Sequence, residues 1–228
     1  MRGRLAAGVV AVVLATSSTG CADQDTATPS PARGVCTDVD TCRVVASTDV
    51  DGDDIRDQVG FVVVSDKRVV VRVRTADGRT LRRSLATVWF PKGELFGASP
   101  IDGRPGAELV VGTTMGAHTL FFTSLTVRSG RLVRLPPPGP GREWMTDAAY
   151  SFHAGVTRRV EDGRVVVVLG QVGRVGLSRR FSGTDRMFVW RDGRWQHIRT
   201  QRTTYRNARA ASKVGGWHVD GLPRSPDF

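Results

Sequence analysis

The sequence predicts an all-β protein, and three observations support this fold class. From about Cys42 onward, short valine-rich runs alternate with tight turns, and no segment keeps the apolar period of about 3.6 residues that marks an amphipathic helix. Units made of a loop, a buried strand and an outer hairpin recur at intervals of roughly fifty to sixty residues. Four dipeptides are typical of two-residue β-hairpin turns, because Gly and Asp tolerate positive φ. They are Asp77-Gly78, Ser129-Gly130, Asp162-Gly163 and Asp192-Gly193.

The first twenty residues have the layout of a secretory signal. Residues 1–4 are basic, residues 5–15 form an apolar run, and small residues follow. These small residues, placed directly before Cys21, resemble a bacterial lipobox, although Ser18 stands where that pattern usually has Leu. The resemblance implies cleavage before Cys21, lipid on its sulfur, and anchoring to the outer face of the cytoplasmic membrane. Ordinary secretion with a free Cys21 is the alternative.

Residues 21–41 are expected to form a flexible tether, because residues 22–34 are rich in Pro, Thr and Ser. The tether holds the two remaining cysteines, Cys36 and Cys42, near its end. In an exported protein a disulfide between them is expected, and it leaves Cys21 as the odd cysteine for lipid. A zinc site is disfavoured, because the nearby residues include no His.

The stretch Asp49–Asp57 is the most informative part of the chain, with five carboxylates followed by an apolar strand. Calcium prefers hard oxygen ligands at alternate positions of a coiled loop, and aspartates occupy positions 1, 3, 5 and 9 here. They are Asp49, Asp51, Asp53 and Asp57. Asp54, at position 6, must adopt the left-handed conformation to keep the turn. The alternative is a solvated acidic turn without a metal.

Residues 42–200 are expected to form a β-repeat domain with three passes of the loop, strand and hairpin unit. The strand of the second pass is Glu108–Gly112, and that of the third is Val165–Gly170. The face formed by Val69, Val71 and Val73 is expected to be buried.

The stretch Asp49–Gly60 resembles the FG-GAP (VCBS-type) repeat of integrin-like β-propellers, in which D-x-D-x-D-G-x-x-D opens a blade. Asp102–Gly112 is similar to a degenerate second copy, and the residues around Glu161–Arg164 resemble a fainter third. The resemblance implies that the carbonyl of Ile55 completes the calcium ligands. Complete propellers of that family usually have about seven blades, so three passes do not close a ring. A compact barrel or sandwich of about ten to twelve strands solves the same edge problem.

Candidate catalytic groups are weakly indicated. The four histidines, His118, His153, His197 and His218, lie in unrelated contexts, and no serine lies in a nucleophile elbow. Tryptophans and phenylalanines fall in or beside the strands and are expected to pack in the core or at its rim. The proline-rich stretch 136–141 is expected to be an exposed spacer. Residues 201–228 are expected to form an irregular tail, with a helical piece near Ala208–Lys213 and a contact from Trp217.

The formal net charge is +11, carried almost wholly by arginine. A basic excess favours anionic partners, but the arginines are scattered, which argues against nucleic acid. The sequence therefore predicts an exported, lipid-anchored, calcium-stabilised β-repeat module that binds or scaffolds an envelope protein or an anionic glycan without catalysis. The alternatives are a cell-wall-directed hydrolase and an anionic-polymer or nucleic-acid binder that uses arginine.

Overall fold

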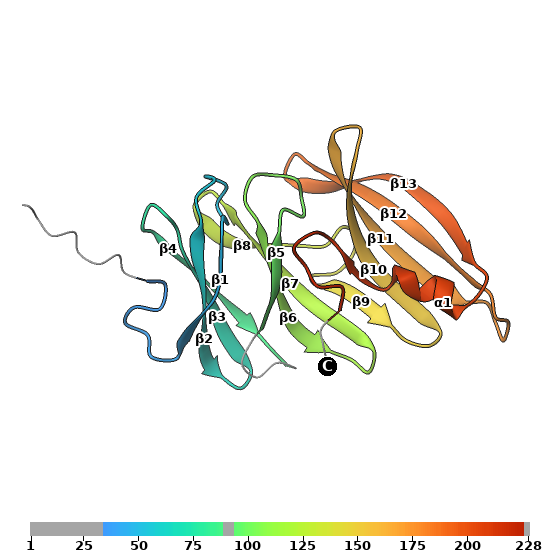
Figure 1. Cartoon of the computed structure of the whole chain (residues 1–228), viewed down its shortest axis with the longest axis horizontal. Coiled ribbons are helices and arrows are strands. Elements are labelled where there is room, and N and C mark those ends of the chain that lie inside the picture. The colour runs from blue at the N-terminus through green and yellow to red at the C-terminus, as the bar shows by residue number, and fades with distance from the viewer. Residues whose placement is uncertain (1–33, 89–93, 226–228) are drawn as a thin grey trace, which may run out of the picture. The chain divides into compact units, whose positions relative to one another are not determined.

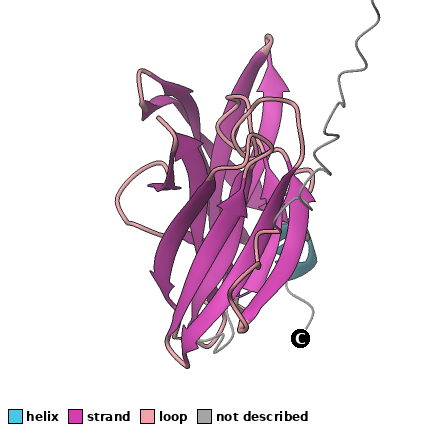
Figure 2. Ribbon diagram, turned by 90° about the vertical axis from the view of Figure 1, so that its left-hand side faces the viewer, coloured by secondary structure: helices cyan, strands magenta, loops and turns pink. Residues whose placement is uncertain are grey.

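The structure is a computed structural model that describes residues 34–88 and 94–225 of the chain. The predicted signal peptide (1–20), the lipidation residue Cys21 and Trp89 lie outside the described residues. Within them, nearly all regular structure is β-strand (magenta in Figure 2), with one short α-helix and one 3₁₀ turn. The all-β prediction is confirmed.

The strands form two antiparallel sheets. The first sheet has the order β1-β2-β3-β4, with β1 at Cys42–Thr48, β2 at Asp57–Ser65, β3 at Arg68–Arg74 and β4 at Thr80–Ala86. The second sheet has the order β13-β12-β11-β10-β9-β7-β6-β5 (Figure 1). Strand β8 pairs with β7, and β14 pairs in parallel with β10. Its strands are β5 (Glu94–Ser99), β6 (Glu108–Met115), β7 (Thr119–Arg128), β8 (Arg131–Leu135), β9 (Trp144–Ala148), β10 (Phe152–Glu161), β11 (Arg164–Arg174), β12 (Phe181–Arg191), β13 (Arg194–Tyr205) and β14 (Gly216–His218).

Three of the four predicted two-residue hairpin turns are present. Ser129, Asp162 and Asp192 have φ values of 50°, 49° and 52°, and the glycine after each also has positive φ. Two successive residues with positive φ match the right-handed twist of the flanking strands. The Asp77-Gly78 hairpin differs, because its strands are joined by five residues, 75–79, rather than by two. Residues 161–164, expected to contain a third copy of the acidic loop, form the β10–β11 turn instead.

The first core lies between the two sheets. Val69, Val71 and Val73 of β3 are fully buried, as predicted, and they belong to one cluster with Leu109 and Val111 of β6. The intervening residues of β6 point to the other face and enter a second cluster, built around several aromatic side chains of the second sheet. Strand β6 is therefore covered on both faces, and the loop that precedes it is held close to the first sheet.

The folded region begins earlier than the sequence suggests. Val35 is fully buried, and its N–H donates to Oε1 of Gln58 at 2.9 Å. The predicted disulfide joins Cys36 to Cys42, with the Cα atoms 5.2 Å apart. Residues 34–41, assigned to the tether from composition, are thus part of the domain because an apolar side chain and a crosslink fix them to β1 and β2.

The C-terminal segment is also more ordered than expected. Strand β13 continues to Tyr205, and the predicted helical piece is present as α1 (Ala208–Ala211) followed by a 3₁₀ turn at Ser212–Val214. Trp217 is 2% exposed in the second core cluster. The predicted helical piece and the predicted contact from Trp217 are thus present, and the difference from the expected irregular segment is that β13 continues through Tyr205.

No helix among the described residues is both long and apolar enough to cross a bilayer.

Candidate functional site

The acidic loop, residues 49–56, joins β1 to β2 and coils around the side chain of Asp49. The carboxylate of Asp49 accepts hydrogen bonds from the N–H of Gly52 at 2.7 Å and from the N–H of Asp54 at 3.0 Å. Gly52 and Asp54 have positive φ, 88° and 65°. The left-handed conformation predicted for Asp54 is confirmed, and the turn forms although a β-carbon is present at that position.

Three of the four predicted aspartate ligands come together. Asp49, Asp51 and Asp57 each offer a carboxylate oxygen, and these oxygens lie within 4.8 Å of one another. The carboxylate of Asp53 is not in this group and accepts a hydrogen bond from the N–H of Ile55 at 2.8 Å. The ligand roles of Asp53 and of the Ile55 carbonyl stay predictions.

Asp57 is the structural centre of the loop. It is fully buried at the first position of β2, and its two oxygens accept from the N–H of Val50 at 2.8 Å and the N–H of Ala76 at 3.0 Å. These bonds tie the acidic loop to the β3–β4 hairpin. Burial raises the pKa of Asp57, and the hydrogen bonds from Val50 and Ala76 oppose that shift.

Within the described residues, Asp51 has one carboxylate oxygen that is paired and one that is not. Its side chain is 9% exposed, and Oδ2 receives the Arg79 guanidinium at 3.2 Å. Its Oδ1 is buried and has no hydrogen-bond partner among the described residues. Burial and then the neighbouring Asp57 and Asp53 raise the pKa of Asp51. A buried carboxylate oxygen without a donor is costly, and a hard cation that takes several oxygen ligands satisfies it. The residues present therefore fit a calcium ion.

A second loop, in which a buried carboxylate also accepts a backbone N–H from seven residues earlier, precedes β6. Glu108 is fully buried at the first position of β6, and its carboxylate accepts from the N–H of Ile101 at 2.6 Å. Asp57 reaches back seven residues to Val50, and Glu108 reaches back seven residues to Ile101. The two stretches, 51 positions apart in the sequence, thus share this carboxylate-to-backbone contact.

The two loops differ in how their carboxylates are neutralised. In the second loop, Arg128 of β7 forms ion pairs with Asp102 and with Oε1 of Glu108, the latter at 3.5 Å. The hydroxyl of Thr126 also donates to Glu108 at 2.8 Å. A guanidinium thus occupies the second loop, whereas the first loop keeps a buried carboxylate oxygen without a donor. Sequence reasoning missed Arg128, because its partners come from a loop 20 or more residues away.

The buried Glu108 gives a testable pH dependence. Burial, with Asp102 nearby, raises the pKa of Glu108 to about 7, against the ordinary 4.5 of the unfolded chain. The folded state therefore binds a proton that the unfolded state does not, and stability falls as pH rises from 4.5 to about 7. We expect the free energy of unfolding of the wild type, relative to Glu108→Gln, to be greater at pH 5 than at pH 8 by about 2–3 kcal/mol. Urea unfolding in the presence of chelator measures the unfolding free energies of the two proteins at each pH. Parallel curves of unfolding free energy against pH would contradict a raised pKa for Glu108.

A hollow of about 520 Å³ opens beside the acidic loop. Asp51 and Asp53 line it from the first loop, and Arg79 lines it from the β3–β4 hairpin. Arg79 pairs with Asp77 at 2.6 Å as well as with Asp51. The Thr75 hydroxyl, followed by contacts from Arg79, lowers the pKa of Asp77 to about 2. The hollow therefore contains one carboxyl group with a raised pKa, Asp51, and one with a lowered pKa, Asp77, and arginines also line it.

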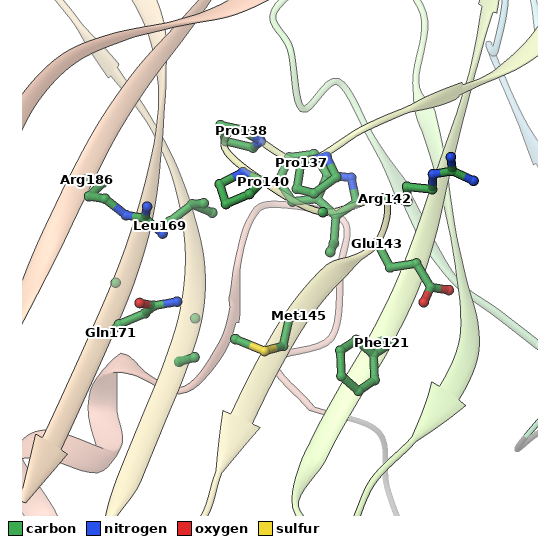
Figure 3. A pocket seen from close by; sticks show the side chains of 15 residues that line it. Phe121, Pro137, Pro138, Pro140, Arg142, Glu143, Met145, Leu169, Gln171 and Arg186 are labelled. Atoms are coloured by element: carbon green, nitrogen blue, oxygen red, sulfur yellow. The ribbon is translucent and has the colours of Figure 1, made fainter.

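A second hollow, of about 290 Å³, lies beneath the proline-rich stretch (Figure 3). Arg186 and Gln171 stand on one wall, Phe121 and Glu143 on the opposite wall, and Met145 lies between them. Glu143 accepts a hydrogen bond from the Thr113 hydroxyl at 2.6 Å, and neither Arg186 nor Gln171 has a side-chain hydrogen bond among the described residues. The hollow therefore offers an apolar floor with a free cation and a free amide on one side.

The proline-rich stretch is exposed at Pro136 and at residues 139–141, as predicted, but its middle covers this hollow. Pro137 and Pro138 are buried, and the carbonyl of Pro136 accepts the Nε1–H of Trp195 at 2.8 Å. The carbonyl of Leu135 accepts the Nε1–H of Trp144 at 2.9 Å. Two indoles thus fix the entry of the stretch, a contact that composition alone does not predict.

The histidines and serines weighed as catalytic candidates lie apart from both hollows. His118 and His197 are exposed, and His153 is buried against Phe181, where burial lowers its pKa. Ser124 is buried, whereas Ser151 is exposed. His218 lines a separate hollow near α1. The only group of three or more potential metal ligands among the described residues is the aspartate triad of the first loop.

Comparison of this chain with protein-family models, with curated proteins and with solved structures finds no match.

Proposed function

We propose that this chain is an exported, lipid-anchored binding module of the cell envelope whose first sheet is stabilised by a calcium ion. One observation carries the proposal most directly. Three aspartate oxygens converge within 4.8 Å, and the buried Oδ1 of Asp51 lacks a donor among the described residues. The second loop meets the same electrostatic need with Arg128, which supports a cation in the first.

The role of the ion is structural. Asp49, Asp51 and Asp57 would hold it, with Asp53 and the carbonyl of Ile55 as further ligands implied by the FG-GAP resemblance. Calcium supplies a divalent charge that neutralises the three carboxylates. Asp57 already joins the loop to β2 and to the β3–β4 hairpin, so a filled site fixes the register of the first sheet.

Calcium titration tests this role on the full chain carrying Cys21→Ser, which cannot be acylated at that residue. We expect one calcium per chain by isothermal titration calorimetry, and no detectable binding by Asp51→Asn. Asp66→Asn is the matched control, because Asp66 is an exposed acid in the β2–β3 hairpin. Heat signals that are the same for all three proteins would sink the metal assignment.

The anchoring rests on residues 1–21 of the sequence. Mass spectrometry of membrane-extracted protein should find a mature chain that begins at an acylated Cys21. An unmodified thiol at Cys21 would end the lipoprotein proposal while leaving the calcium site untouched.

The hollow beneath the proline-rich stretch is the proposed ligand site. Its apolar floor suits an apolar side chain or a sugar face, and the unpaired Arg186 suits a carboxylate or sulfate. An envelope protein or an anionic glycan supplies both features. A photo-cross-linker at Gln171 should trap such a partner on intact cells, and the same group at Gln201, on the exposed part of β13, should not.

A cell-wall hydrolase is the second candidate, favoured by the hollow beside the acidic loop. Burial raises the pKa of Asp51, whereas the pKa of Asp77 is lowered to about 2. Carboxylates with displaced pKa values can act as an acid and a base. Release of fragments from labelled cell wall by the wild type, lost in Asp77→Asn with unchanged calcium binding, would select this function.

A further inference from the structure

One end of the second sheet carries a hairpin tip with an exposed apolar side chain and several arginines. The β11–β12 connection, residues 175–180, lies at this end together with the segment before β10 and the segment after β13. The strand pairing places them so, because β11 pairs with both β10 and β12 there, and β12 pairs with β13. Segments separated by up to about sixty residues in sequence therefore share one end of the sheet.

Leu177, at the tip, is 97% exposed. The loop that presents it is held by its own hydrogen bonds. The N–H of Val175 donates to the carbonyl of Arg180 at 3.0 Å, the N–H of Ser178 donates to the carbonyl of Val175 at 3.1 Å, and Nε of Arg174 donates to the carbonyl of Ser178 at 2.7 Å. Hydrogen bonds within the loop thus hold a large apolar side chain in solvent.

Arginines lie in each of the segments that follow β11 and β13 at this end of the sheet. The guanidinium of Arg174 lies 5.3 Å from the ring centre of Tyr150, whose side chain is 74% exposed. The segments at this end contain no Asp or Glu, and their arginines form no ion pair within the described part of the chain. We name this surface the basic tip; it comprises Tyr150, Arg174, Val175, Leu177, Arg179, Arg180, Arg206 and Arg209.

The opposite end of the same sheet has a mixed charge. The β10–β11 turn contains Glu161 and Asp162, and the β12–β13 turn contains Asp192. Glu161 is ion-paired with Arg159 at 2.6 Å. Both ends therefore carry exposed arginines, but only the basic tip combines them with a fully exposed leucine and no acidic residue, which suits a negatively charged partner.

We propose that the basic tip docks on the surface of an anionic phospholipid membrane. Leu177 enters the boundary between head groups and acyl chains, Tyr150 lies at the interface, and the arginines pair with lipid phosphates. A soluble polyanion accounts for the arginines but leaves Leu177 exposed, so the membrane is the occupant that uses both features. This contact needs neither the calcium site nor the lipid on Cys21.

Vesicle sedimentation with the full chain carrying Cys21→Ser tests the proposal. Binding is expected to phosphatidylglycerol vesicles and not to phosphatidylcholine vesicles. Leu177→Ser should weaken the partition coefficient about 10-fold, the order expected from loss of one inserted leucine. The double variant Arg179→Gln/Arg180→Gln should weaken it about 30-fold, because two charges near the surface are lost.

The matched controls lie at the opposite end of the sheet. Val160→Ser removes an apolar side chain that is 62% exposed, and Arg191→Gln/Arg194→Gln removes two exposed arginines. Both controls should bind as the wild type does. Failure of the wild type to bind phosphatidylglycerol vesicles overturns the proposal, and so does an equal loss in the controls. Unchanged binding by Leu177→Ser, with a loss in Arg179→Gln/Arg180→Gln, overturns the membrane proposal in favour of a soluble polyanion. Soluble polyphosphate would then displace the protein from the vesicles.

Discussion

Trp217→Ala is expected to lower the free energy of unfolding by about 3–5 kcal/mol, the range for removal of a buried tryptophan. Trp217 is 2% exposed in β14 and lies against three aromatic rings. Its ring centre is 5.5 Å from that of Phe122, 5.6 Å from that of Trp144 and 6.4 Å from that of Phe96. The substitution therefore leaves a cavity in the second core and releases the C-terminal segment.

Trp217→Phe separates the loss of packing from the loss of the indole N–H. The Nε1 of Trp217 has no hydrogen-bond partner among the described residues, so Phe removes a buried unpaired donor while keeping an aromatic ring. We expect Trp217→Phe to be far less destabilising than Trp217→Ala in urea unfolding. An Ala variant within about 1 kcal/mol of the wild type would show that residues 216–218 are not part of the core.

Asp57→Asn is expected to lower the free energy of unfolding by about 1.5–3 kcal/mol in the presence of chelator. Asp57 is fully buried and accepts two backbone N–H groups, from Val50 and Ala76. An amide has one acceptor oxygen, so Asn leaves one of these donors facing its own NH₂ group. The effect does not need a metal, and urea unfolding without calcium measures it.

Asp66→Asn removes the same charge at an exposed position of the β2–β3 hairpin and should leave stability within about 0.5 kcal/mol of the wild type. Equal stabilities of Asp57→Asn and Asp66→Asn would mean that the acidic loop does not depend on the hydrogen bonds of Asp57.

The parts of the fold that sequence predicts are those set by local physics. The turns at Ser129, Asp162 and Asp192 follow from residues that tolerate positive φ, and the buried face of β3 follows from strand alternation. The acidic loop is predictable for the same reason, because Asp49, Asp51 and Asp57 lie within a segment of nine residues.

The parts that sequence does not predict depend on partners distant along the chain. Trp217 is buried because aromatic residues of β5, β7 and β9 surround it, and Arg128 is placed by carboxylates of the loop before β6. The roof formed by Pro137 and Pro138 exists because Trp195, 59 residues from Pro136, donates to that carbonyl. A periodicity has no information on such pairs, so it does not predict which residues hold the proline-rich stretch and the C-terminal segment in place.

The effect of calcium on thermal stability tests the proposed role of the acidic loop most directly. Thermal unfolding of the full chain carrying Cys21→Ser is compared in calcium and in chelator. At a calcium concentration of about 100 Kd, the midpoint should rise by about 5–10 °C relative to chelator. The rise should vanish in Asp51→Asn, which lacks the charge of the buried carboxylate. Equal midpoints for the unsubstituted loop in calcium and in chelator would contradict a calcium-stabilised first sheet.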